Sequence, residues 1–219
     1  MYTCAYCTKH TCMTDGDDYP LNCPCRDKET VARSLSITKD EAHFPIAVQS
    51  ALVDAEGRYM LTRAEEMMLF AHKLKAKKIG LAFCVGFSEE ANRFAKILRE
   101  NGFEVESVIC KCGSVEKENL GLYGKQKLFD YDPMCNPVGQ ALFLEKAETE
   151  LNIMMGLCVG HDTMFMMNTK APATVFAVKD RVLAHNPMGA LYSSHQYYKR
   201  LHTYMKDKVL TAENLQSDK

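Results

Sequence analysis

The sequence predicts an α/β protein: a three-layer sandwich with a mostly parallel, Rossmann-like sheet and an N-terminal cysteine-rich metal knuckle. First, segments with helical and strand periodicity alternate between residues 62 and 178, which is typical of βαβ units. Second, two apolar strand segments end in Cys-Val-Gly directly before a helix start, at Cys84 and Cys158. Third, ten cysteines crowd the N-terminus and the ends of the expected strands.

The elements follow from periodicity and from start and stop signals. Residues 28–57 are apolar at helical spacing, in a short helix over 29–35 and a longer one over 40–56. Thr62 and Glu65 form a capping-box pattern, and Ser88 and Asp162 are suited to the N-cap position. Expected strands are 78–84, 103–110, a run ending at 158, and 173–178. Expected helices are 62–75, 88–100, 135–150, 162–168 and 194–205.

The chain therefore divides into a knuckle at 1–27, an α/β domain at 28–206 and a polar tail at 207–219, packed as one compact unit. Residues 114–134 are long, polar and weakly periodic. Such loops in compact domains are usually functional covers or mobile segments. Because this loop joins two cysteine positions, we interpret it as a cover over the site.

Composition excludes several classes of protein. A net charge of −1 gives no support for a nucleic-acid partner, and no apolar run is long enough to span a bilayer. The N-terminus lacks the pattern of a signal peptide, so the expected location is cytoplasmic. Structural disulfides are rare in that compartment, so ten cysteines indicate metal or iron–sulfur ligation.

The N-terminal segment is the stronger metal signal. Its turn-rich sequence cannot bury enough apolar surface to fold alone, so a bound metal would supply the missing stability. The expected ligands are Cys4, Cys7, Cys12 and Cys23. Cys25 is a spare, and His10 could replace one thiolate. Zinc and an iron–sulfur cluster both fit, and the alternative is a redox-active or simply reduced cysteine-rich tail.

A second group of cysteines lies at strand ends and helix starts, where an open α/β sheet binds ligands. We expect Cys84, Cys112, Cys135 and Cys158 to hold a cofactor, an iron–sulfur cluster of the 4Fe–4S type. Cys84 and Cys158 would face each other if the first and third strands are neighbours. Cys110 is interpreted as structural, pointing into the sheet. A second zinc, a thiol redox pair, or small residues at tight turns remain alternatives.

Polar residues near this edge suggest further roles. His161 follows Cys158 closely and is a candidate catalytic residue, as a ligand or a proton donor to a bound substrate. Lys179, Arg181 and His185 lie after the last strand and could bind an anionic group. Lys170 is expected to be an ordinary surface residue.

Several motifs together resemble one known family. They are Cys4-x2-Cys7 with Cys23-Pro24, then Cys135-Asn-Pro, Gly156-Leu-Cys-Val-Gly-His-Asp162 and Val178-Lys-Asp-Arg-Val-Leu-Ala-His-Asn-Pro187. The chain resembles a prokaryotic family of uncharacterised metal-binding proteins defined by a domain of unknown function and N-terminal cysteines. The resemblance implies a metal at Cys4, Cys7, Cys12 and Cys23, and no established reaction.

Two functions follow as expectations. The first is an iron–sulfur protein acting in redox or open-iron chemistry, of lyase or desulfurase type, on a small molecule or with a redox partner protein. The second is a non-catalytic zinc or soft-metal binding or sensor module. The sequence names no substrate.

Overall fold

The structure is a computed structural model that describes residues 1–202. The chain divides into two compact units, Met1–Leu61 and a second that begins at Thr62, and each is described by itself. This boundary differs from the expected one at residue 27, because the helical residues 28–61 group with the cysteine-rich segment and not with the sheet. The expected tail at 207–219 lies outside the described residues.

The first unit consists of short 3-10 turns followed by two helices, α1 (Lys28–Thr38) and α2 (Phe44–Gly57). The Asp27 carboxylate accepts the N–H of Thr30 and caps α1. The second helix begins four residues later than the predicted residue 40, so that prediction is wrong at its start. Asp40 accepts the N–H groups of Ala42 and His43 in a separate turn, which leaves Pro45 in the first turn of α2, where no N–H donor is needed.

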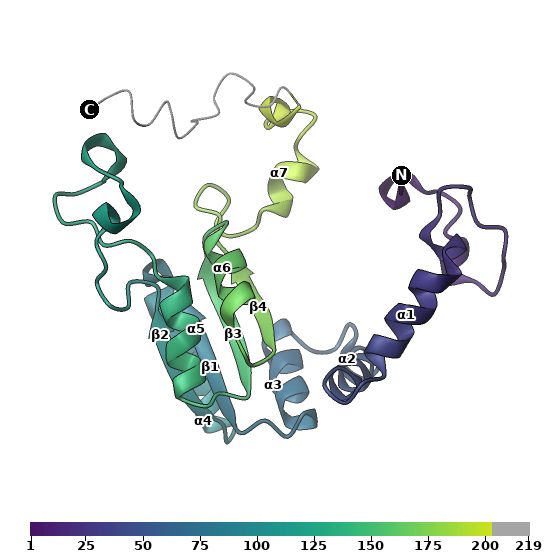
Figure 1. Cartoon of the computed structure of the whole chain (residues 1–219), viewed down its shortest axis with the longest axis horizontal. Coiled ribbons are helices and arrows are strands. Elements are labelled where there is room, and N and C mark those ends of the chain that lie inside the picture. The colour runs from purple at the N-terminus through teal and green to yellow at the C-terminus, as the bar shows by residue number, and fades with distance from the viewer. Residues whose placement is uncertain (203–219) are drawn as a thin grey trace. The chain divides into compact units, whose positions relative to one another are not determined.

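The second unit contains a four-stranded, all-parallel sheet, so the α/β class is confirmed (Figure 1). Its strands are β1 (Lys78–Phe83), β2 (Glu104–Ile109), β3 (Leu151–Leu157) and β4 (Ala173–Val178), each within one residue of the predicted bounds where both were given. The strand order is β2-β1-β3-β4. The chain goes from β1 to β2 on one side and then crosses to β3 on the other. The first and third strands are therefore neighbours, as expected, and the order reverses between them.

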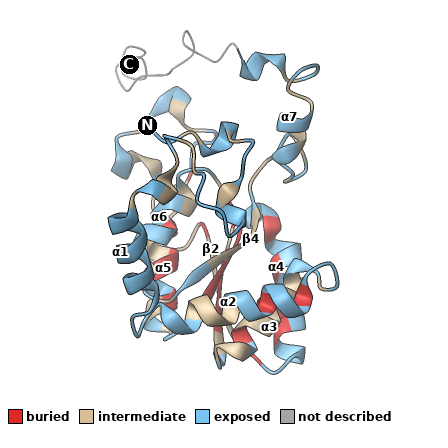
Figure 2. Cartoon of the chain, turned by 90° about the vertical axis from the view of Figure 1, so that its right-hand side faces the viewer, coloured by how far each residue is buried: buried red, intermediate tan, exposed pale blue. Residues whose placement is uncertain are grey.

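Helices lie on both faces of this sheet. They are α3 (Arg63–Lys73), α4 (Ser88–Glu100), α5 (Pro137–Lys146) and α6 (His161–Asn168). The short α7 (Met188–Tyr192) follows β4 in the chain. Figure 2 shows α5 and α6 on one face and α3 and α4 on the other. Every residue of β3 is buried, because it is an inner strand covered on both faces. Leu81, Leu144 and Phe165 represent the apolar core on strand and helix alike.

The helix starts test the capping predictions. The capping box of Thr62 and Glu65 is present at α3 and is confirmed. The other two N-cap predictions are wrong: Phe87 holds the N-cap position of α4 and Gly160 that of α6, so Ser88 and Asp162 lie inside the first turn. The predicted helix 194–205 is wrong over 194–202, where only a 3-10 turn at Lys199–Leu201 forms. Its last residues are outside the described part. No helix among the described residues is long and apolar enough to cross a membrane.

Candidate metal centre

The carboxyl edge of the sheet gathers the residues that carry chemistry. The residue directly after each strand is Cys84 for β1, Cys110 for β2, Cys158 for β3 and Lys179 for β4. Phe83, the last residue of β1, pairs with Ile109, the last residue of β2, and with Met155, two residues before the end of β3. Parallel strands all end at one edge, so four positions far apart in sequence meet there.

Three thiols form the centre of this group. We call Cys84, Cys110 and Cys135 the thiol cluster. Cys110 is buried, and its Sγ accepts the Val85 N–H at 3.3 Å. Hydrogen bonding from the Cys110 thiol lowers the pKa of Cys84 to about 5 and the pKa of Cys135 to about 4. The same contacts, that to Cys135 first, raise the pKa of Cys110, so Cys110 keeps the shared proton.

His161 extends the cluster from the first turn of α6. Its contact with Cys135 raises the pKa of His161, because the imidazolium lies next to a thiolate. It is half-buried, and so is Cys135, which precedes the N-cap residue of α5. The predicted catalytic histidine therefore contacts a predicted cofactor ligand. Its catalytic role stays a prediction.

Cys158 lies beside the cluster and has a cationic partner. Arg181 Nη2 donates to Cys158 Sγ at 3.3 Å, and this contact with Cys158 is the main cause of the raised pKa of Arg181. Lys179 Nζ lies 4.2 Å from the centroid of the Phe87 ring, and its charge contributes to the lowered pKa of Cys84. The segment after β4 thus brings two cations to the thiols.

Cys112 and Cys110 differ in their contacts, and their roles stay predictions. The Cys112 thiol points to the backbone oxygen of Asn136 at 3.6 Å, and burial raises the pKa of Cys112. Cys110, interpreted from sequence as structural, instead connects Cys84 and Cys135. One signal could have found it: Cys110 follows β2 as Cys84 follows β1, so the two are next to each other in register.

Asn136 fixes this arrangement. Its backbone N–H donates to the Cys110 oxygen at 2.7 Å, and its side-chain amide donates to the Cys112 oxygen at 3.2 Å. Its Oδ1 accepts the Gly139 N–H and caps α5. The turn after β2 is therefore tied to the start of α5, and Cys135 is held against Cys110.

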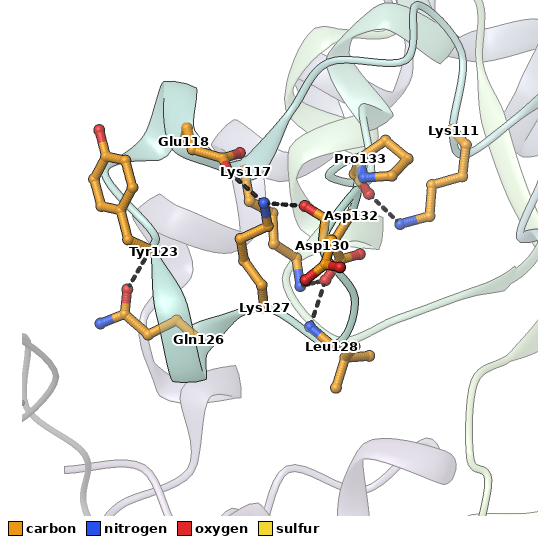
Figure 3. Close-up of polar contacts among 10 residues, drawn as sticks. All are labelled: Lys111, Lys117, Glu118, Tyr123, Gln126, Lys127, Leu128, Asp130, Asp132 and Pro133. Atoms are coloured by element: carbon orange, nitrogen blue, oxygen red, sulfur yellow. Dashed lines mark hydrogen bonds and ion pairs between the residues drawn. The ribbon is translucent and has the colours of Figure 1, made fainter.

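Ion pairs between its own residues stabilise the loop 114–134 (Figure 3). Lys117 Nζ contacts the buried carboxylate of Asp132 at 2.5 Å, and Lys127 pairs with Glu118. Asp132 also accepts the Leu128 N–H at 2.8 Å. At its base, Lys111 donates to the Pro133 oxygen. The loop is thus an ordered segment, and its action as a cover stays a prediction.

The cysteines of the first unit gather in part. Cys4, Cys7 and Cys23 line one cavity of about 220 Å³. Cys25 contacts Cys23, which raises the pKa of Cys25, and Cys12 acts on it at longer range. Cys23 therefore both lines the cavity and contacts Cys25. His10 is not among the residues that line this cavity.

Neither the thiol cluster nor the set of cysteines in the first unit has the geometry of a metal site. Across residues 1–202, no set of three or more His, Cys, Asp and Glu side chains is placed as the ligands of a single ion. Metal binding at either place would require the thiols to turn toward a shared point. All ten cysteines are free of disulfides, so these rotations are not prevented by a covalent bond.

The fold and the site define the class: a parallel α/β protein with a row of thiols at the carboxyl edge, preceded by a cysteine-rich unit. The chain belongs to the family described as protein of unknown function DUF1847, whose model matches residues 23–176. It is also similar to an uncharacterized protein of Methanocaldococcus jannaschii, 41% identical over 198 residues, which cover 90% of this chain and 97% of that protein. The expectation of an uncharacterised family is confirmed.

Proposed function

We propose that the protein is a cysteine-ligated metal protein whose reactive centre is an iron–sulfur cluster at the carboxyl edge of the sheet. The ligands would be Cys84, Cys110 and Cys135. The observation that carries this proposal is the chain of contacts that runs from Cys84 through Cys110 to Cys135 and on to His161. Cys84 follows β1 and His161 follows β3, and the strand order reverses between these two strands, which is the usual place for a ligand in such a sheet.

The single proton of the Cys110 thiol is an argument for a cation among the three sulfurs. Cys84 and Cys135 both depend on the Cys110 thiol for their lowered pKa. A thiol has one proton and donates to one sulfur at a time. A multivalent cation among the three sulfurs would satisfy them all at once. Thiolates around a tetrahedral ion lie roughly 3.8 Å apart, given metal–sulfur bonds of ~2.3 Å, so neighbouring thiols need only small rotations.

The donor set fits a soft metal or a cluster. Three thiolates without a carboxylate select iron–sulfur clusters, zinc or copper(I). A cluster held by three thiolates would supply electron transfer or an open iron for a lyase or desulfurase-type reaction on a small molecule. His161, beside Cys135, is placed to hold or transfer a proton. Cys158 is half-buried next to the cluster and is the alternative fourth ligand.

A second candidate is a zinc or soft-metal binding module without catalysis. The cavity lined by Cys4, Cys7 and Cys23 favours a zinc site in the first unit, with Cys12 or Cys25 as the fourth ligand. Two cysteines spaced as C-x2-C on one wall of that cavity are typical of structural zinc. This candidate holds alone if the edge thiols bind no iron.

Three further proposals concern the fold, the location and the partners of the protein. We propose a three-layer, Rossmann-like arrangement, because helices lie on both faces of the sheet (Figure 2). Ten cysteines without a disulfide support a reducing compartment, the cytoplasm. The partners would be a small molecule or a redox partner protein, with no nucleic acid.

The test is anaerobic purification of the full chain, with iron, sulfide and zinc measured per protein and the visible spectrum recorded. We expect iron and acid-labile sulfide, lost in Cys110→Ser and Cys135→Ser. Cys112→Ser is the matched control, since its thiol lies in the same turn but points to the Asn136 oxygen, and it should retain the iron. A colourless, iron-free protein under these conditions would contradict the iron–sulfur proposal and leave the zinc module.

A further inference from the structure

Two cations beside the thiol cluster have no carboxylate partner among the described residues. Lys179 and Arg181 are absent from every ion pair formed within residues 1–202. Lys117, Lys127 and Lys170 in the same unit each pair with a carboxylate. The nearest anionic groups of these cations are the sulfurs of the site: Lys179 acts on Cys84, and Arg181 contacts Cys158.

The fold holds both cations in place. The Lys179 N–H donates to the Leu157 oxygen at 3.1 Å and so extends the pairing of β3 and β4 by one residue. The Lys179 ammonium rests over the Phe87 ring and lies 3.1 Å from where a β carbon at Gly86 would be. His185 packs on the same ring, with centroids 4.4 Å apart. The two segments that carry Cys84 and Lys179 are therefore locked together.

Arg181 is held by one of its five donors. Its Nη2 contacts Cys158 Sγ at 3.3 Å, while the residue as a whole is exposed. The remaining N–H groups of a guanidinium form a planar fork that matches a carboxylate. A lysine two residues away adds a second, more flexible charge. A fork and a point charge on one side of a reactive centre are a recognition device for a planar oxyanion.

We propose that Lys179 and Arg181 form an oxyanion subsite, and that the small molecule taken by the centre carries a carboxylate group. This inference rests on the proposed function, because it names the class of molecule for that same centre. The subsite itself consists of protein side chains only. It can therefore be tested by a thiol reaction that needs no metal.

The experiment compares iodoacetate with iodoacetamide at Cys158 in the full chain as purified anaerobically and in a parallel sample treated with a chelator, which frees Cys158 if it ligates the metal, followed by peptide mapping. Both reagents alkylate the thiolate in the same way, forming a carbon–sulfur bond and releasing iodide, and they differ only in the carboxylate. The ratio of the iodoacetate rate to the iodoacetamide rate at Cys158 is divided by the same ratio for 2-mercaptoethanol, a thiol with no charged group beside it. We call the result the quotient. We expect a quotient of about 10, the lower end of the gain from electrostatic focusing.

The variants separate the subsite from general charge. Lys179→Met and Arg181→Met should each reduce the quotient several-fold, and Lys170→Met, which removes an ion-paired surface lysine, should leave it unchanged. Arg181→Lys keeps the charge but loses the fork. In the unaltered protein, sodium acetate should slow the alkylation of Cys158 by iodoacetate more than sodium chloride does at equal ionic strength. Arg181→Lys should retain most of the quotient but lose this protection by acetate.

A quotient near 1 in the unaltered protein, or one that both Lys179→Met and Arg181→Met leave unchanged, overturns the subsite. Metal analysis of the same samples reports separately on the proposed function. An iron-free protein with a high quotient would contradict the cluster and keep the subsite. An iron-containing protein with a quotient near 1 would keep the cluster and overturn the subsite.

Discussion

The ring of Phe87 fills the space beside Gly156. A β carbon at Gly156 would lie 2.1 Å from Phe87 Cε2, far inside van der Waals contact. Gly156 has φ +67, at an irregularity in the pairing of β3 with β4. The glycine thus meets two needs at once, a left-handed backbone and a close approach. Phe87 in turn supports Lys179 and His185 beside the thiols.

Gly156→Ala should therefore destabilise the protein by about 2–5 kcal/mol, the sum of left-handed strain and overpacking. Urea unfolding measures the change. Gly102→Ala is the matched control, since Gly102 has φ +88 but nothing within 4 Å of its β carbon position. It should cost only the strain, about 1–2 kcal/mol. Equal losses in the two variants would show that the Phe87 contact is unimportant.

Removal of the central thiol should change the titration of its neighbours. Hydrogen bonding from the Cys110 thiol is the main cause of the lowered pKa of Cys84 and of the lowered pKa of Cys135. In Cys110→Ala, both pKa values should rise toward the ordinary cysteine value of about 8.5. The pH profile of iodoacetamide alkylation measures this, and reactivity at pH 6 should fall. Cys112→Ala should leave the profile unchanged, and a shift of similar size there would contradict the arrangement.

Asp132 should make the loop 114–134 sensitive to acid. The Leu128 N–H and then Lys117 lower the pKa of Asp132 in the folded protein. A group with a lowered folded pKa stabilises the fold above its unfolded pKa, and this contribution is lost as the pH falls through the folded pKa. Amide protection in residues 114–134, corrected for intrinsic exchange, should therefore decrease as the pH approaches 3.

Asp132→Asn should reduce this protection roughly tenfold at pH 7 and remove much of its acid dependence, because the charged contact with Lys117 is lost. Asp130→Asn is the control, since Lys127 contacts the backbone oxygen of Asp130. Retention of the acid dependence in Asp132→Asn would assign it to another group.

The zinc proposed for the first unit should be lost when Cys23 is changed. Cys23 lines the cavity with Cys4 and Cys7 and also contacts Cys25. Cys23→Ser should therefore lower the zinc content of the full chain by one equivalent, and Cys110→Ser should not. Zinc retention by Cys23→Ser after dialysis against a chelator would exclude Cys23 as a ligand. Cys25→Ser tests whether the spare cysteine is needed.

Much of the fold follows from local sequence. The strands 78–84 and 173–178 and the helix 88–100 were predictable because their periodicity, turn residues and caps agree. The helix expected at 194–205 does not form over 194–202, because basic and aromatic composition does not ensure a buried face. The late start of α2 depends on one side chain, Asp40, which diverts two N–H groups into a turn.

The sequence by itself determined that cysteines end three strands, because the apolar runs and glycine turns mark those ends directly. Only the tertiary structure decided which thiols meet. The order β2-β1-β3 makes Cys110 the neighbour of Cys84, and Asn136 ties the next turn so that Cys135 approaches Cys110 while Cys112 turns away. Strand order and the direction of a side chain after a strand depend on contacts between distant segments. No local pattern contains them.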